Sequence, residues 1–160
     1  MTLTIEQLTQ DLAEQLIQQQ KMICCAESCT GGLIAKTFTD LAGSSEWFER
    51  GFVSYSNQAK MDMLGVSADT LQQYGAVSEA TAAEMASGAI AHSLAQYAIA
   101  VTGIAGPTGG SDEKPVGTVW FGFATPPQVV CERQLFEGDR QQVRQQTLEY
   151  ALQRILELID

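Results

Sequence analysis

The chain has 160 residues, of which 45% are hydrophobic and 18% charged. This size and balance are typical of one compact domain and disfavour a disordered, collagen-like or coiled-coil chain. A formal charge of −10 has the wrong sign for displacing counterions from a nucleic acid, so general nucleic-acid binding is disfavoured. Because no apolar run approaches the roughly 20 residues that cross a bilayer and no secretory signal opens the chain, we expect a cytoplasmic protein without membrane contacts.

The cysteine and histidine content restricts the available chemistry. Cys24, Cys25, Cys29 and Cys131 show no C-x-x-C spacing, which disfavours both a zinc cage and a disulfide framework. His92 is the single histidine, so a multi-histidine metal site is excluded. We therefore expect reduced thiols and no metal site.

Hydrophobic periodicity and capping residues predict alternating helices and strands. Because strands are interleaved with helices and no linker or repeat interrupts residues 1–160, we expect one α/β domain, a three-layer α/β/α sandwich with a mixed central sheet. In chain order, the pattern predicts a helix over the first twenty residues, a strand over 22–26, a helix over 33–41, a strand over 51–56, a short helix from Asn57 to Gly65, helices capped by Ser67 and Ser78 with the second running to about residue 95, a strand over 97–101, a hairpin of 117–124 and 129–136 turned at Pro126 and Pro127, and a last helix beginning at Asp139.

The first candidate segment for chemistry is ESCTGG, residues 27–32, which follows an expected strand. In open α/β sheets ligands bind beyond the carboxyl ends of strands, and small side chains with two glycines let backbone N–H groups approach a ligand. Ser28 is a candidate nucleophile, Cys29 competes with it as a thiolate, and spacing does not separate them. Alternatively, a serine or threonine here simply caps the next helix.

The second segment is YSNQAK, residues 55–60. If Asn57 caps the short helix, Lys60 occupies the third helical position, where the macrodipole disfavours an ammonium ion. Partial burial would lower the lysine pKa in the same direction. A neutral amine can act as the general base for a serine hydroxyl. The alternative is an ordinary solvated lysine.

The third segment, TGIAGPTGG over residues 102–110, begins an irregular stretch that reaches Gly117. Such long connections are usually functional, although a mobile surface loop is the alternative. The segment lacks both the P-loop ending and the dinucleotide fingerprint, so we expect no ATP or NAD cofactor. At the start of the last helix, Arg140 would suit a phosphate or carboxylate, or belong to a solvated face. His92 is expected to be a packed or surface residue.

Several stretches together resemble the CinA C-terminal domain family. They are AESCTGGLIA, GFVSYSNQAKMDMLGV, GAVSEATAAEMA and AVTGIAGPTGG, and the match continues through KPVGTVWFGF and FEGDRQQVR. The length is similar to that of the family's stand-alone nicotinamide-nucleotide amidases. The resemblance implies hydrolysis of the carboxamide of nicotinamide mononucleotide to nicotinate mononucleotide and ammonia, a step in pyridine-nucleotide (NAD) recycling, by a homodimer.

The resemblance also implies a Ser-Lys mechanism at matching positions. Ser28 would be the nucleophile and Lys60 its base, with Tyr55 relaying the proton or orienting the lysine. Amide N–H groups of Gly31, Gly32 or Gly103 are candidates to hold the oxyanion, and the glycine loop or Arg140 to hold the phosphate. The small-molecule substrate is expected to contact Cys29, Thr30, Gly31, Gly32, Asn57, Thr102, Gly103, Gly106 and Arg140.

Two other functions remain open from the sequence. A non-catalytic nucleotide-binding module would keep the pocket and act through partners. It would release no ammonia from nicotinamide mononucleotide. A cysteine hydrolase would use Cys29, so iodoacetamide would abolish activity while Ser28→Ala would retain it.

Overall fold

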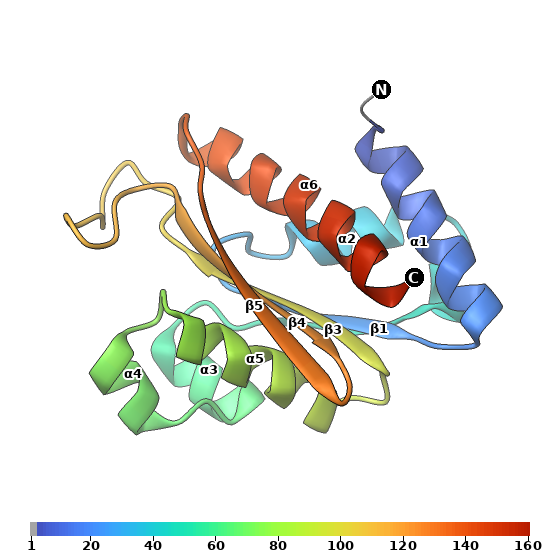
Figure 1. Ribbon diagram of the computed structural model, residues 1–160, viewed down its shortest axis with the longest axis horizontal. Helices are drawn as coiled ribbons and strands as arrows, with labels where there is room; N and C mark the ends of the chain where they lie inside the picture. Colours follow the sequence, from blue (N-terminus) through green and yellow to red (C-terminus); the bar gives the residue numbers. More distant parts are fainter. Residues whose placement is uncertain (1–2) are drawn as a thin grey trace.

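The computed structural model describes residues 3–160 and shows a five-stranded sheet between two layers of helices (Figure 1). The predicted three-layer α/β/α sandwich is thus confirmed. None of the helices within these residues is both long and apolar enough to cross a membrane. The elements are α1 Ile5–Gln19, β1 Ile23–Glu27, α2 Leu33–Thr39, the 3-10 turn η1 Ser44–Glu46, β2 Phe48–Val53, α3 Asn57–Leu64, α4 Ala68–Tyr74, α5 Glu79–Ala91, β3 Tyr97–Gly103, β4 Thr118–Thr125, β5 Gln128–Leu135 and α6 Arg140–Ile159.

The strand order brings three candidate segments to one edge of the sheet. The order is β2-β1-β3-β4-β5, in which β1 runs parallel to β2 and β3, while β4 is antiparallel to β3 and β5. Glu27, the last residue of β1, pairs with Val53 of β2 and Val101 of β3. The segments that follow these three residues therefore leave the sheet side by side, where ligands of α/β proteins bind.

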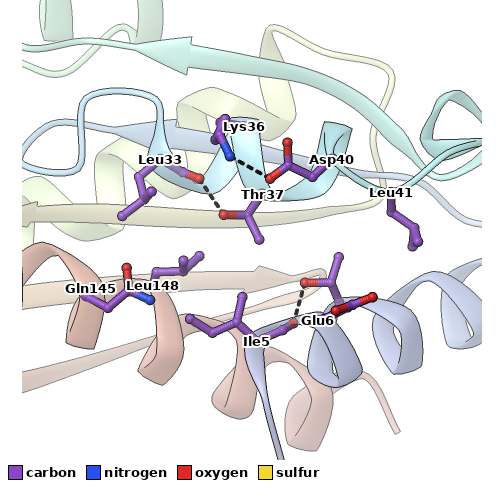
Figure 2. A pocket seen from close by; sticks show the side chains of 10 residues that line it. Ile5, Glu6, Leu33, Lys36, Thr37, Asp40, Leu41, Gln145 and Leu148 are labelled. Carbon is purple, nitrogen blue, oxygen red and sulfur yellow. Dashed lines mark hydrogen bonds and ion pairs between the residues drawn. The ribbon is translucent and has the colours of Figure 1, made fainter.

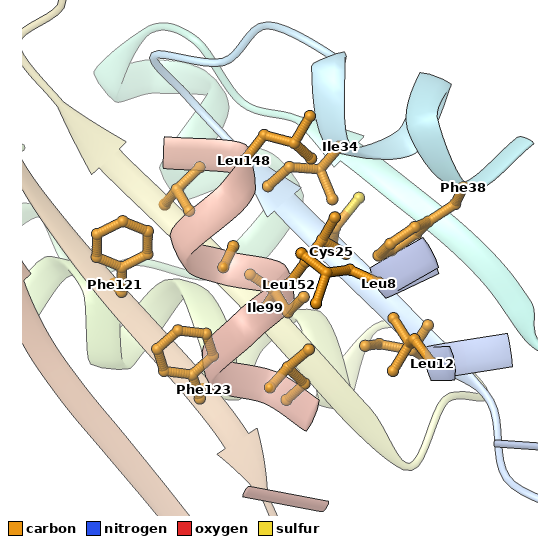
Figure 3. Close-up of a cluster of buried hydrophobic side chains, with 14 of the residues drawn as sticks. Leu8, Leu12, Cys25, Ile34, Phe38, Ile99, Phe121, Phe123, Leu148 and Leu152 are labelled. Carbon is orange, nitrogen blue, oxygen red and sulfur yellow. The ribbon is translucent and has the colours of Figure 1, made fainter. Parts of the chain in front are cut away.

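The helices α1, α2 and α6 cover one face of the sheet, and α3, α4 and α5 cover the other (Figure 1). Figure 3 shows the first face, where Phe38, Leu148 and Leu152 gather over Cys25 and Ile99 of the central strands. Full burial of each large apolar side chain contributes roughly 1.5–3 kcal/mol. This face is the main scaffold of the fold.

The second face has small side chains, which let α5 pack closely. Gly88 of α5 approaches the last turn of α3, and a Cβ there would clash with the carbonyl oxygen of Leu64. Because α3 also carries Lys60, this close approach fixes the helix that delivers the lysine. Packing on this face is thus directly linked to the position of the candidate base.

Most predicted elements are confirmed, with differences in their bounds. The capping box of α1, between Thr4 and Gln7, is present, although residues 1–2 of the predicted helix lie outside the described residues. The strand predicted over 51–56 instead spans Phe48–Val53, because the chain turns away after Val53 toward Lys60. The helix α5 ends at Ala91, earlier than predicted, where the ring Nδ1 of His92 contacts the carbonyl oxygen of Gly88 at 2.8 Å.

Candidate active site

Ser28 and Lys60 meet beyond the carboxyl end of β1, although 32 positions separate them in the chain. The Lys60 Nζ lies 3.0 Å from the Ser28 Oγ, 3.1 Å from the Ser54 carbonyl oxygen and 3.0 Å from the Tyr55 carbonyl oxygen. The lysine is 1% exposed and Ser28 is 7% exposed. The amine is therefore enclosed by one hydroxyl and two carbonyl groups.

The three neighbours of the amine fit a neutral lysine. Carbonyl oxygens only accept hydrogen bonds, so the two N–H bonds of a neutral amine can point at Ser54 and Tyr55. The nitrogen lone pair is then left for the hydroxyl proton of Ser28. After proton transfer, the third N–H points back at the serine oxygen. When Lys60 donates to the Ser28 oxygen, the Ser28 hydroxyl can donate to the Tyr55 carbonyl oxygen at 3.5 Å, and it turns toward the nitrogen lone pair when the amine is neutral.

Burial lowers the pKa of Lys60, and this is the largest effect on the group. The opposing influence is a negative charge on Cys29. Burial raises the pKa of that thiol to about 12, so it carries almost no charge near neutral pH. Lys60 forms no ion pair within residues 3–160. The amine thus lacks the carboxylate that would normally stabilise its charged form.

The predicted cause of this shift was partly wrong. Ser56, not Asn57, is the N-cap of α3, and its hydroxyl accepts from the Ala59 amide at 3.0 Å. Lys60 is therefore the fourth helical residue rather than the third, one position further from the N-terminal N–H groups. The expected burial is confirmed, and it lowers the pKa as predicted.

A cavity of about 340 Å³ opens in front of Ser28 and Lys60. Ala76 and Val77, in the loop before α5, also line it. They belong to the GAVSEATAAEMA stretch, in which no site residue was predicted. Their position is fixed by Thr102, whose hydroxyl donates to the Ala76 carbonyl oxygen at 2.9 Å. The predicted residues that line the cavity are Ser28, Cys29, Tyr55, Asn57, Lys60, Thr102, Gly103, Gly106 and Arg140.

Thr30, Gly31 and Gly32 do not line this cavity. The Gly31 amide donates to the Ser28 carbonyl oxygen at 3.1 Å, and the Gly32 amide donates to Glu27 at 3.2 Å. The Thr30 hydroxyl also donates to Glu27, at 2.6 Å. The expectation that the Gly31 and Gly32 amides are free to hold an oxyanion is therefore contradicted, because both are already engaged inside the protein.

Glu27 explains why these groups turn inward, and sequence reasoning missed it. Its fully buried carboxylate also accepts from the amides of Ile34 and Ala35 at 2.9 and 3.0 Å. The N–H groups of the first turn of α2 are thereby satisfied by a side chain. The available signal was a lone glutamate ending the apolar strand β1. This carboxylate fixes the turn that carries Ser28.

The sequence predicts that Tyr55 either relays the proton or orients the lysine. Its backbone carbonyl, not its hydroxyl, accepts from Lys60 at 3.0 Å, a contact that fits the orienting role. The side chain is 62% exposed, and its hydroxyl accepts from the Arg140 Nη2 at 3.3 Å. The Arg140 Nη1 donates to the Gly106 carbonyl oxygen at 2.9 Å. Tyr55 and Arg140 thus join two sides of the cavity.

Known proteins resemble the chain over nearly its whole length. The model of the CinA C-terminal domain matches residues 5–159. Nicotinamide-nucleotide amidohydrolase PncC of Escherichia coli strain K12 is 54% identical over 150 residues, 93% of this chain and 91% of that protein. A CinA-like protein of Syntrophobacter fumaroxidans is 48% identical over 92% of this chain but only 35% of its own length. The crystal structure of the competence/damage inducible protein CihA from Agrobacterium tumefaciens has a TM-score of 0.94 at 44% identity, covering 100% of both chains.

Proposed function

The chain belongs to the CinA C-terminal domain family, and on that premise we propose that residues 1–160 form one amidase domain that hydrolyses nicotinamide mononucleotide to nicotinate mononucleotide and ammonia. The observation that carries the proposal is the 3.0 Å contact between Ser28 and a buried lysine that has no carboxylate partner in the described part of the chain. The name of the E. coli relative supports the substrate.

The reaction follows from the contact between the Lys60 nitrogen and the Ser28 oxygen. Ser28 attacks the carboxamide carbon while its proton passes to the Lys60 nitrogen, which gives a tetrahedral oxyanion. The ammonium group of Lys60 then donates this proton to the departing nitrogen, so ammonia leaves and an ester on Ser28 remains. Water attacks the ester with Lys60 again as the base. The products are nicotinate mononucleotide and the original serine.

A serine rather than a cysteine nucleophile is supported by the environment of Cys29. A thiol needs its thiolate form to attack, and burial raises the pKa of Cys29 to about 12. The Lys60 nitrogen is hydrogen-bonded to the Ser28 oxygen. The base therefore serves the hydroxyl, and Cys29 is assigned to the wall of the cavity.

Arg140 is proposed to bind the phosphate of the substrate. Within residues 3–160 it forms no ion pair, and its two hydrogen bonds go to uncharged oxygens of Gly106 and Tyr55. A phosphate can replace these acceptors with charge-assisted hydrogen bonds. Binding energy from the phosphate would hold the carboxamide at Ser28.

A non-catalytic binding module has weaker support. Burying a lysine without a counter-ion costs free energy, and binding alone would not require that residue. The decisive assay measures ammonia released from nicotinamide mononucleotide by wild type, Ser28→Ala and Lys60→Met, each with and without a chelator. We expect release by wild type only, in both conditions. No release by wild type would instead favour the binding module, and release by Ser28→Ala would favour Cys29.

The cellular role and assembly form part of the same proposal. Conversion of nicotinamide mononucleotide to nicotinate mononucleotide would return pyridine nucleotide to NAD synthesis. We also propose a homodimer, which light scattering would detect as a particle of twice the 17.3 kDa chain mass.

A further inference from the structure

Lys114 begins the stretch KPVGTVWFGF, which has no part in the reaction proposed above. Its Nζ donates to the carbonyl oxygen of Tyr74, the last residue of α4, at 2.6 Å. Although Asp112 and Glu113 precede it in the chain, Lys114 forms no ion pair within residues 3–160. The ammonium group thus joins two segments that are 40 positions apart in the sequence.

Both of the segments that Lys114 joins line the cavity at Ser28. The loop between β3 and β4 contributes residues 104–106, and the connection between α4 and α5 contributes Ala76 and Val77. Figure 1 shows the two segments at the same end of the sheet. Lys114 itself does not line the cavity. It therefore acts on the walls of the cavity rather than on a ligand inside it.

The connection between α4 and α5 is a firm point of attachment for the loop. Two hydroxyl groups at the start of α5 donate to the Gly75 carbonyl oxygen at 3.0 and 2.7 Å. The Thr102 hydroxyl donates to the Ala76 carbonyl oxygen at 2.9 Å. Lys114 engages the preceding carbonyl group, that of Tyr74. Three successive carbonyl groups of the connection are thus held by side chains.

The loop has a second attachment at Gly106, whose carbonyl oxygen accepts from the Arg140 Nη1 at 2.9 Å. In the proposed complex the substrate phosphate replaces this carbonyl as the acceptor for Arg140. The loop then loses that attachment at the moment when the substrate binds. Because Lys114 lies outside the cavity, its bond to Tyr74 is kept. Of these two attachments, only that of Lys114 holds the loop in the substrate complex.

We propose that Lys114 is a positioning residue for substrate binding, whose bond to Tyr74 holds the loop of residues 104–117 once the substrate phosphate has bound Arg140. This inference rests on the proposed amidase function. A loop that is already held in its bound position avoids the free-energy cost of being ordered by the ligand. Substrate and transition state need the same ordered loop, so losing Lys114 should raise KM and leave kcat nearly unchanged.

The kinetic test compares Lys114→Met, Lys114→Arg and Lys36→Met. We expect Lys114→Met to raise KM for nicotinamide mononucleotide about 10-fold, the size expected for one hydrogen bond to a charged group, with kcat within about 2-fold. Lys114→Arg keeps a charged donor and should recover most of the affinity. Lys36→Met makes the same change in net charge at an exposed lysine outside this cavity, so it should leave KM within about 2-fold.

Hydrogen exchange tests the attachment without turnover or ligand. Arg140→Met removes the bond to Gly106, so that Lys114 is the remaining one of the two attachments. Adding Lys114→Met to this variant should speed exchange of the amides of residues 104–117 about 10-fold, while the amides of β1 exchange as before. Adding Lys36→Met instead is the matched control and should change neither segment.

Four results would overturn the role of Lys114. They are a wild-type KM in Lys114→Met, a loss confined to kcat, loop exchange in the double variant that is as slow as in Arg140→Met, and equally faster exchange in β1. A wild-type enzyme that releases no ammonia would overturn the amidase function together with this inference. Loss of ammonia release in Ser28→Ala, with a wild-type KM in Lys114→Met, would leave the amidase function standing and remove only the role of Lys114.

Discussion

Two hollows of the described part of the molecule are lined by a lysine, and the smaller of these two is the proposed site of the chemistry. The groove between α1, α2 and α6 measures about 500 Å³, against about 340 Å³ at Ser28. Figure 2 shows Lys36 in that groove, paired with Asp40 at 2.8 Å. Both partners are more than half exposed, whereas Lys60 is buried and faces uncharged oxygens. Burial and the lack of a counter-ion, rather than the size of the hollow, distinguish the lysine that we propose as the base.

The two lysines differ in how well their surroundings stabilise the charged ammonium form. Lys36 is exposed to solvent and lies 2.8 Å from the Asp40 carboxylate, so its surroundings supply both water and a counter-ion. Lys60 has neither, and burial lowers its pKa. A lysine becomes a base when the fold removes its counter-ion and its water while leaving it an acceptor for each N–H.

The largest expected effect is the loss of kcat when Lys60 is substituted. Lys60→Met removes the base, and a positioned general base contributes about 10²- to 10⁴-fold, so kcat for ammonia release should fall by that factor. Lys36→Met is the matched control in the other hollow and should leave kcat within about 2-fold, because surface ion pairs contribute little. Equal losses in the two variants would contradict the comparison.

The pH dependence of kcat/KM should identify the base. The active form of Lys60 is neutral, so the rate rises as pH increases through the Lys60 pKa and then levels off. Because burial lowers that pKa, the midpoint should lie below the ordinary lysine value of about 10.4. An acid limb with its midpoint at or above that value would show that an ordinary lysine, or another group, controls the rate.

The turn that carries Ser28 should depend on the buried carboxylate of Glu27. Glu27→Gln replaces one accepting oxygen with a donor that faces backbone N–H groups, and an unsatisfied buried group costs about 1–3 kcal/mol, with more for a charged partner. We expect the free energy of unfolding in urea to fall by about 2–4 kcal/mol. As a control, Glu157→Gln alters an exposed carboxylate and should change it little. Equal stability of the Glu27 variant and wild type would remove this role.

The smallest effect is expected at Cys29. Burial holds its pKa near 12, so iodoacetamide should react slowly and Cys29→Ala should keep kcat within about 3-fold, since no thiolate takes part. Ammonia release before and after alkylation measures this. If iodoacetamide completely inactivates wild type and Cys29→Ala has no activity, the Cys29 thiol rather than Ser28 is the nucleophile.

Local patterns predicted the elements, because apolar spacing and caps are set by neighbours in the chain. The capping box at Thr4, the cap at Ser78 and the hairpin at Pro126 are of this kind. The start of β2 was missed because Phe48–Arg50 is ordered by pairing with β1, which no local signal reveals.

Site residues that lie in a recognisable motif could be predicted from the sequence. Roles that depend on contacts between distant parts of the chain could not. Ser28 and Lys60 could be chosen from the sequence, and the structure brings them together. The role of Tyr55 could not, because its hydroxyl meets Arg140, which is 85 positions away. Arg144 contacts Cys29 across 115 positions, and such long-range hydrogen bonds depend on the complete packing of α6 against the sheet.

The most direct measurement of the central claim is an NMR titration of ¹³C-labelled lysine side chains, with Lys60→Met used to assign the Lys60 signal among the four lysines of the chain. The account predicts that Lys60 loses its proton below the ordinary lysine value of about 10.4, because burial lowers its pKa. A Lys60 signal with its midpoint at or above that value would contradict a neutral base at Ser28.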